Sequence, residues 1–340
     1  MQNARFNQIK TFSIQFVLSG VITGIFLYFF IQKMPIVFLL GVCIGSLVYI
    51  FIRIYEAFIK PYLYQRNFFL ALITNTAIYV VIIAFSALVG MGIINGFRFE
   101  YYFTNLPEFI LSQQMLYGLL FGLSLSFIFN LYTMFDTLLG KNFLIKLLVG
   151  TYHKPFEEQR IFIFLDLKSS TAIAEKLGHK KFLSLLNDFF YDLAEAVVAT
   201  KGEIYKYVGD EAIITWKMKP GLKDNRCLEC FFRFKDKIGH NQHKYMKKYG
   251  LVPLFKAGMH GGEIVTGEMG FIKKEITFLG DVLNTTARIE ASCNDFGEEL
   301  IVSDFLLSRL NFDGQNKIKS LGEIQFRGKE TKIGVSSVYR

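Results

Sequence analysis

The stretch KYVGDEAIITW, Lys206–Trp216, contains two apolar, strand-like runs that meet at a Gly-Asp pair. A Gly-Asp pair between strand-forming runs predicts a β-hairpin, here with Asp210 at its tip. Because side chains alternate along a strand, Lys206, Val208 and Asp210 would share one face, and Glu211 would point the other way. The pattern therefore predicts a pocket with an acid at its mouth and a buried lysine behind it.

A second acidic residue, Asp166, ends an apolar run that predicts another strand. IFIFLD, residues 161–166, is a continuous apolar run bounded by charge, which is typical of a central strand covered on both faces. If this strand neighbours the hairpin, Asp166 and Asp210 meet at one edge of the sheet. Adjacent carboxylates repel each other unless a cation lies between them, and hard divalent cations prefer oxygen ligands. The two aspartates are therefore candidate metal ligands.

LKSSTAIAEKLG follows Asp166 directly and predicts a short helix. Its serines and threonine offer N-cap oxygens, and the backbone N–H groups at a helix start bind anions. A metal pair beside such a helix start indicates a nucleoside triphosphate site. The candidate phosphate-binding residues are Leu167, Lys168, Ser169, Ser170 and Thr171.

The remaining segments predict an α+β fold in which helices cover a mainly antiparallel sheet. Residues 258–260, GMH, are expected to form a turn that contains His260, and His260 is expected to be structural. We expect helices over 179–200, 224–248 and 281–293, a hairpin over 204–216, a strand, turn and strand over 255–270, and short strands in the tail.

Five motifs in this half, in the order that the family has them, resemble the class III nucleotide cyclase catalytic domain. They are FLDLKSST, KYVGDEA, GMHGGEIVTGEMG, LGDVLNTTARIE and FRGKE. The resemblance covers roughly residues 157–340 and implies a ferredoxin-like antiparallel sheet covered by helices. The resemblance thus assigns the α+β fold that the residues predict to a particular family. The first half of the chain contains no motif of this family.

The resemblance implies a role for particular residues. Asp166 and Asp210 would hold two divalent cations, Mg²⁺ or Mn²⁺, and Lys206 and Thr277 would select the base. Asn284 and Arg288 would stabilise the transition state, and Lys329 of FRGKE would contact phosphate.

Two positions depart from the commonest family pattern. Ser170 stands where an aromatic residue is usual, and Thr277 stands where Asp is frequent. Lys206 with Thr277 resembles a Lys/Thr subgroup that uses ATP. An ammonium only donates, so Lys206 suits adenine N1, an acceptor, better than the guanine N1–H.

The implied activity is an adenylate cyclase that converts ATP to 3′,5′-cyclic AMP and pyrophosphate at a homodimer interface. Two alternatives stay open: a guanylate cyclase, which Lys206 opposes, and a nucleotide-binding membrane receptor with a regulatory cyclase-like domain. The net charge of +9 does not call for nucleic acid, since the inner membrane leaflet and a triphosphate account for it.

The composition of the first half of the chain predicts a membrane region in contact with the lipid bilayer. Residues 1–150 hold only 9 of the 38 Lys and Arg and 4 of the 29 Asp and Glu. Four windows free of these residues, 11–32, 34–52, 67–97 and 109–135, approach or exceed the ~20 residues that a spanning helix needs. We expect a membrane domain over 1–140 with four transmembrane helices, a juxtamembrane helix or linker over 141–156, and a catalytic domain over 157–340.

Basic residues orient these spans. They gather before the first span, between the second and third, and after the fourth, so both termini and the catalytic domain are expected in the cytoplasm. The expected location is the inner (plasma) membrane, multi-pass, with Gly96–Glu108 as the longest external loop.

Cys227 and Cys230 form a CxxC followed by His240 and His243. This spacing is compatible with a zinc site, but CLECFFRF has a helical pattern. We expect the two thiols to face a protein core.

Overall fold

The computed structural model describes part of the chain, and the described residues belong to two compact units, Met1–Leu138 and Leu139–Arg340. Each unit is treated separately below. The described residues are 21–25, 28, 35–58, 73–85, separate positions between 113 and 131, and then 150, 152–272, 274–312, 316–325 and 332–340.

The described part of the first unit is helical. Helix α2, Pro35–Phe58, contacts the helical residues 73–85 through Tyr55, whose hydroxyl donates to the side chain of Asn75. The ring of Tyr55 also lies edge to face against Tyr79, with 5.6 Å between centroids.

None of the helices in the described residues is both long enough and apolar enough to cross a bilayer. The second predicted span overlaps α2. The other three lie largely outside the described residues, and Gly96–Glu108 lies wholly outside them. The four spans therefore stay a prediction.

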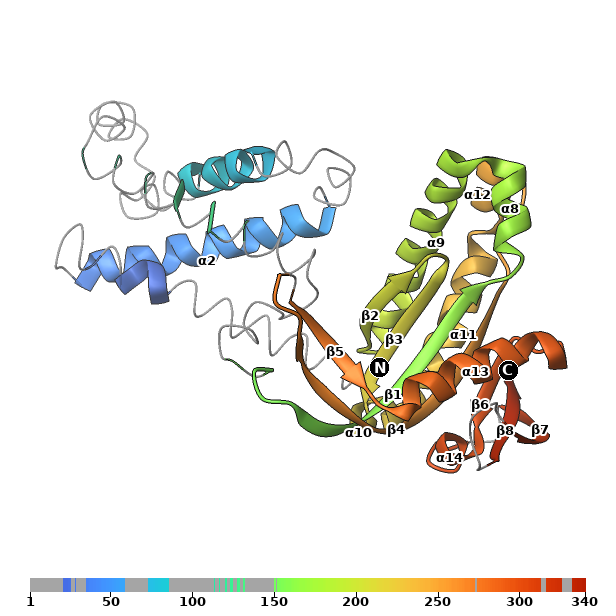
Figure 1. The fold of residues 1–340 in the computed structure, drawn as a ribbon. Coiled ribbons are helices and arrows are strands. Elements are labelled where there is room, and N and C mark those ends of the chain that lie inside the picture. Colours follow the sequence, from blue (N-terminus) through green and yellow to red (C-terminus); the bar gives the residue numbers. More distant parts are fainter. Residues whose placement is uncertain are drawn as a thin grey trace. The chain divides into compact units, whose positions relative to one another are not determined.

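The second unit is built on an eight-stranded sheet within the described residues (Figure 1). Its order is β2-β3-β1-β4-β6-β8-β7, with β5 paired to β4 beside this path. Every pair is antiparallel except β4 with β6, so the sheet is mainly antiparallel, as predicted, with one parallel pair. The strands are β1 Phe156–Leu167, β2 Glu203–Val208, β3 Glu211–Lys217, β4 Phe255–Met269, β5 Glu275–Leu279, β6 Leu300–Ser303, β7 Lys317–Ile324 and β8 Ile333–Tyr339.

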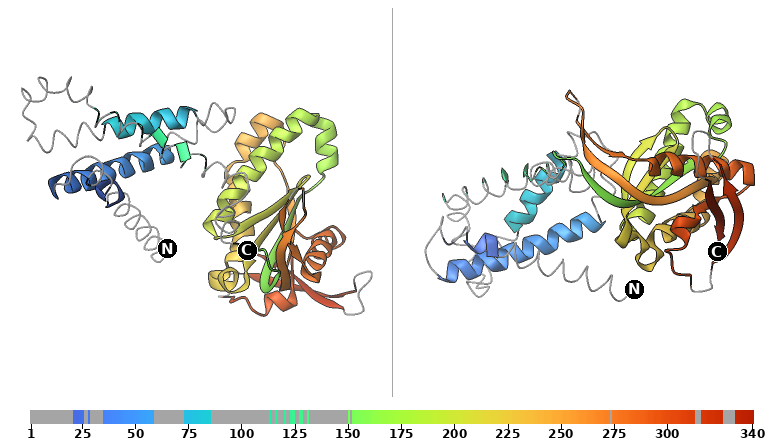
Figure 2. Two further views of the ribbon diagram at one scale, coloured as in Figure 1. Left: turned by 60° about the vertical axis from the view of Figure 1, so that its left-hand side comes forward. Right: turned by 60° about the horizontal axis from the view of Figure 1, so that its bottom comes forward.

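Helices cover both faces of the sheet (Figures 1 and 2). Helices α9 and α11 pack on one face, and α13 packs on the other, chiefly against β4. The helix predicted over 224–248 is two helices, because the chain bends at Asn241, whose side chain donates to buried Asp192 at 2.9 Å. The helices of this unit are α8 Ser170–Leu177, α9 His179–Ala199, α10 Met218–Leu222, a 3₁₀ turn Lys223–Asn225, α11 Arg226–His240, α12 Gln242–Tyr249, α13 Asp281–Phe296 and α14 Asp304–Leu307.

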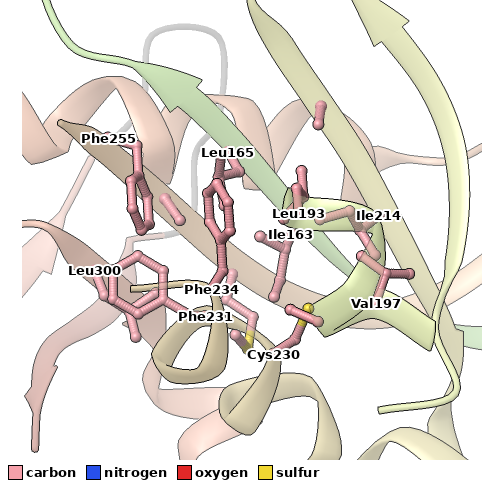
Figure 3. Close-up of a cluster of buried hydrophobic side chains, with 14 of the residues drawn as sticks. Ile163, Leu165, Leu193, Val197, Ile214, Cys230, Phe231, Phe234, Phe255 and Leu300 are labelled. Atoms are coloured by element: carbon pink, nitrogen blue, oxygen red, sulfur yellow. The ribbon is translucent and has the colours of Figure 1, made fainter. Parts of the chain in front are cut away.

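Alternation along β1 decides which face Asp166 joins. Ile163 and Leu165 enter the larger core with α9 and α11, drawn in Figure 3. Phe162 and Phe164 enter a smaller cluster on the opposite face, which also contains residues of β5 and α13. Because successive side chains point to opposite faces, Asp166 belongs with Phe164 on the α13 face. The apolar run thus contributes side chains to both cores, and its last residue, Asp166, lies on the α13 face of the sheet.

The predicted turn around His260 is wrong, because β4 runs unbroken through it. The glycines there are needed for close packing. A Cβ on Gly258 would lie 2.2 Å from the backbone nitrogen of Glu290, and one on Gly262 would lie 2.7 Å from Val282, both on α13. The Nδ1 of His260 lies 2.7 Å from the Ser303 hydroxyl, and its structural role stays a prediction.

Candidate active site

The carboxylates of Asp166 and Asp210 converge at one end of the sheet. Strands β1 and β3 pair antiparallel, with Asp166 opposite Glu211, and Asp210 precedes Glu211 in the hairpin turn. Gly209, at φ +66°, occupies the left-handed region that this turn requires. Burial raises the pKa of Asp166 to about 6, with further contributions from the negative charges of Asp210 and Glu290. The convergence predicted from the sequence is therefore present.

Glu211 faces this same cluster, contrary to the prediction. Cross-strand partners share a face, so pairing with Asp166 places Glu211 on the α13 side. Burial raises its pKa to about 7, assisted by the charges of Glu290, Asp166 and Asp210. The alternation argument failed because Asp210 lies in the turn, where the two-residue period does not apply.

Lys256 and Glu290 complete the cluster, and sequence reasoning missed both. Lys256 is opposite Asp166 on β4, and its Nζ lies 3.6 Å from Asp166 Oδ2 and 2.9 Å from Glu290 Oε1. The side chains of Lys256 and Glu290 are only 8% and 9% exposed. One signal was available: Lys256 is the single charge in the apolar run FKAGM, and a charge inside a buried strand needs a buried partner.

The residues present fit a hard divalent cation. Two aspartates with mutually repelling carboxylates offer the oxygen ligands that Mg²⁺ and Mn²⁺ prefer. No ready-made group of three or more His, Cys, Asp or Glu metal ligands occurs among the residues described. A cation held by Asp166 and Asp210 would therefore take further oxygens from a nucleotide and from water.

The start of α8 supports only part of the predicted phosphate site. Leu167 ends β1 in register with Phe255, and the N–H of Lys168 donates to the carbonyl of Leu254 at 2.8 Å. Ser169, at φ 57°, provides no side-chain cap. The helical N–H groups still open toward an anion begin at Ser170 and Thr171.

Lys206 lies in a different setting from the one predicted. A bulge interrupts β2 between Ile204 and Lys206. The Lys206 side chain is 45% exposed in the single chain, so it is not buried, and its Nζ lies 2.7 Å from Glu275 Oε2 on β5. Glu275 and Thr277 are two residues apart on one strand, so both point to the same face. The structure thus brings Lys206 beside the strand that carries Thr277.

Asn284 and Arg288 lie one turn apart on α13 and share a face of that helix. Glu290 is two residues beyond Arg288, which is about 200° around the helix axis. Glu290 points to the sheet, so Asn284 and Arg288 point away from the Asp166 cluster of their own chain. Lys329 lies outside the described residues.

The CxxC pair is a core feature, as predicted. Cys227 and Cys230 are buried on α11, and Cys230 lies among Phe231, Phe234 and Val197 in Figure 3. Burial raises the pKa of both thiols to about 12, which opposes the thiolate form that zinc requires.

Comparisons with known proteins agree with this architecture. The model of the adenylate and guanylate cyclase catalytic domain matches residues 151–336. Adenylate cyclase 2 of Rhizobium meliloti is 38% identical over 201 residues, which cover 59% of this chain and 55% of that protein. An adenylate cyclase of Anabaena cylindrica is 23% identical over 186 residues, covering 52% of this chain and 36% of that protein. This chain therefore spans about half or less of the length of these relatives.

The fold is also similar to that of solved structures. A bacterial light-regulated adenylyl cyclase superposes with a TM-score of 0.55 at 20% identity and covers 64% of each chain. Together with the family match over more than half of the sequence, this confirms the resemblance seen in the five motifs. The chain belongs to the adenylate and guanylate cyclase catalytic domain family.

Proposed function

We propose that the protein is an adenylate cyclase that forms 3′,5′-cyclic AMP and pyrophosphate from ATP. One observation carries the proposal: the carboxylates of Asp166 and Asp210 converge at a partly buried sheet end within a cyclase-family domain. The similarity to Adenylate cyclase 2 of Rhizobium meliloti supports the choice of reaction.

The chemistry is an attack of the ribose 3′-oxygen on the α-phosphorus, with pyrophosphate leaving. Asp166 and Asp210 would hold two divalent cations, which when bound lower the pKa of the 3′-hydroxyl and neutralise the triphosphate. The open N–H groups at the start of α8 would meet phosphate oxygens. We assign no side chain as a general base.

The base would be read by Lys206 and Thr277. The ammonium of Lys206 donates to adenine N1, and the Thr277 hydroxyl can accept from the exocyclic amine. Guanine presents the reverse pattern, so Lys206 favours ATP and opposes the guanylate cyclase alternative. The assignment of Lys206 and Thr277 to base recognition follows from the resemblance to the Lys/Thr subgroup.

Arg288 and Asn284 would act on the phosphoryl group and the ribose of the same nucleotide. The guanidinium would meet the charge that grows on the α-phosphoryl oxygens, and the amide would orient the ribose by a neutral hydrogen bond. In one chain these side chains point away from Asp166. We therefore propose a homodimer in which each site takes its aspartates from one chain and its Asn284 and Arg288 from the other.

We also propose that the first half of the chain anchors this domain to a membrane. The charge-free windows of the first half and the distribution of its basic residues support four spans with both termini in the cytoplasm. Protease added outside sealed cells should leave residues 160–340 intact. Their cleavage from outside would contradict this topology.

Turnover of ATP and GTP by the purified full chain, with Mg²⁺ and with Mn²⁺, tests the function. We expect cyclic AMP from ATP and little cyclic GMP, and we expect Asp166→Ala and Asp210→Ala to abolish both. Asp236→Ala, on the exposed side of α11, is the matched control and should behave as wild type. Faster turnover of GTP, or normal turnover by either aspartate variant, would contradict the proposal.

A further inference from the structure

The buried ammonium of Lys256 lies between two carboxylates at unequal distances. Its Nζ is 2.9 Å from Glu290 Oε1 but 3.6 Å from Asp166 Oδ2. Both contacts are ion pairs, and the shorter one is to Glu290. Lys256 is therefore held closer to Glu290 than to Asp166, the expected metal ligand.

The position of Glu290 is fixed by backbone packing. Gly258 lies two residues after Lys256 on β4, on the same face, and α13 presses against it so closely that a Cβ there would meet Glu290 N at 2.2 Å. The close contact between the two backbones places Glu290 beside this part of β4, where its carboxylate meets the ammonium of Lys256.

This arrangement matters for metal binding. A lysine within reach of a metal-binding carboxylate competes for the same oxygens, because both cations seek the same negative charge. We propose that Glu290 is a positioning residue that holds the Lys256 ammonium off Asp166, so that Asp166 stays open to a divalent cation. The inference rests on the proposed function, since it takes Asp166 as a metal ligand.

The substitution that isolates this role is Glu290→Gln. The amide has nearly the same shape but no charge, so it holds an ammonium less strongly, and Lys256 would turn to Asp166. We expect the Mn²⁺ concentration at half-saturation to rise about 10-fold or more, which corresponds to losing one charge-assisted contact. Lys256→Met in the same chain removes the competing cation, so the double variant should return to within about 3-fold of wild type.

The experiment measures Mn²⁺ binding to the full chain by electron paramagnetic resonance, with an ATP analogue that lacks the 3′-hydroxyl, so that no turnover is needed. Glu195→Gln removes the partner of Lys237 in an ion pair of 2.6 Å between α9 and α11, and it serves as the control with unchanged binding. Thermal midpoints show that each variant is folded.

The outcomes separate this inference from the proposed function. Weak binding by Glu290→Gln that the added Lys256→Met restores supports the positioning role. Wild-type binding by Glu290→Gln, or weak binding that the double variant does not restore, overturns it. Asp166→Ala should lose binding in every case, and full binding by Asp166→Ala would overturn the proposed metal site itself.

Discussion

The Nζ of Lys206 lies 2.7 Å from Oε2 of Glu275, and this ion pair joins the β2–β3 hairpin to β5. Tyr205 and Phe278 add a ring contact with 4.6 Å between centroids across the same junction. The ion pair therefore brings Lys206 beside the strand that carries Thr277, the other expected base-reading residue. This couples the lysine of the KYVGDEA motif to the strand that precedes α13.

Reversing the charge at Lys206 should change the choice of nucleotide. Glu at this position accepts where lysine donates, and it would also face Glu275, so we expect Lys206→Glu to lower both ATP turnover and the ATP/GTP ratio. Initial rates with both nucleotides measure the effect, and Lys181→Glu, an exposed position on α9, is the control. An unchanged ratio would place Lys206 outside the base pocket.

The β4–β5 hairpin should contribute to the homodimer. Phe271 is 94% exposed and Ile272 is 100% exposed, and two fully exposed apolar side chains at one tip favour burial against a partner. We expect Phe271→Ser with Ile272→Ser to weaken dimerisation of the detergent-solubilised protein in sedimentation velocity and to lower turnover. Met246→Ser, at an exposed apolar position on α12, is the control. An unaltered dimer would exclude this tip from the interface.

Stability should depend on Glu158 in a pH-dependent way. Burial opposes its ionisation, but hydrogen bonds from Thr266 and Arg160 outweigh burial and lower its pKa below the ordinary 4.5. A depressed folded-state pKa stabilises the fold above the unfolded value, and this stabilisation is lost as the pH falls through the folded value. Glu158→Gln should therefore destabilise by about 2 kcal/mol at pH 7, where it leaves the buried Arg160 without a full counter-charge, and by less below pH 4.5.

Thermal midpoints at neutral and acid pH check this prediction. Glu157→Gln is a matched control, because Glu157 is the exposed neighbour on the opposite face of β1. An equal loss at both pH values would mean that the Glu158 charge does not stabilise the fold.

Much of the second unit could be predicted because its elements obey simple periods. The hairpin, the central strand ending at Asp166 and the helices over 179–200 and 281–293 follow from alternation and helical spacing, and the structure confirms them. The turn predicted at His260 was wrong because glycine occurs both in turns and where two backbones pack closely. In β4 it allows a helix to approach the strand, and that need arises from α13, far along the chain.

The site was predictable at its strand ends but not in its surroundings. Asp166 and Asp210 were found because a charge after an apolar run is conspicuous. Lys256 and Glu290 were missed because they meet only when α13 crosses β4. The buried position expected for Lys206 is not present in the single chain, where its side chain is 45% exposed and its ammonium pairs with Glu275 of β5.

The shared dimeric site is the central claim, and complementation tests it most directly. Asp210→Asn binds a hard cation poorly, and Arg288→Ala should cost roughly 100- to 1,000-fold in turnover, so each variant alone should be nearly inactive. In a mixed dimer one site collects both lesions, and the other combines an intact Asp210 with the partner chain's intact Arg288. Co-expression should restore up to about half of the wild-type cyclic AMP production per mixed dimer. If mixed dimers form and stay as inactive as their parents, each site belongs to a single chain and the account is wrong.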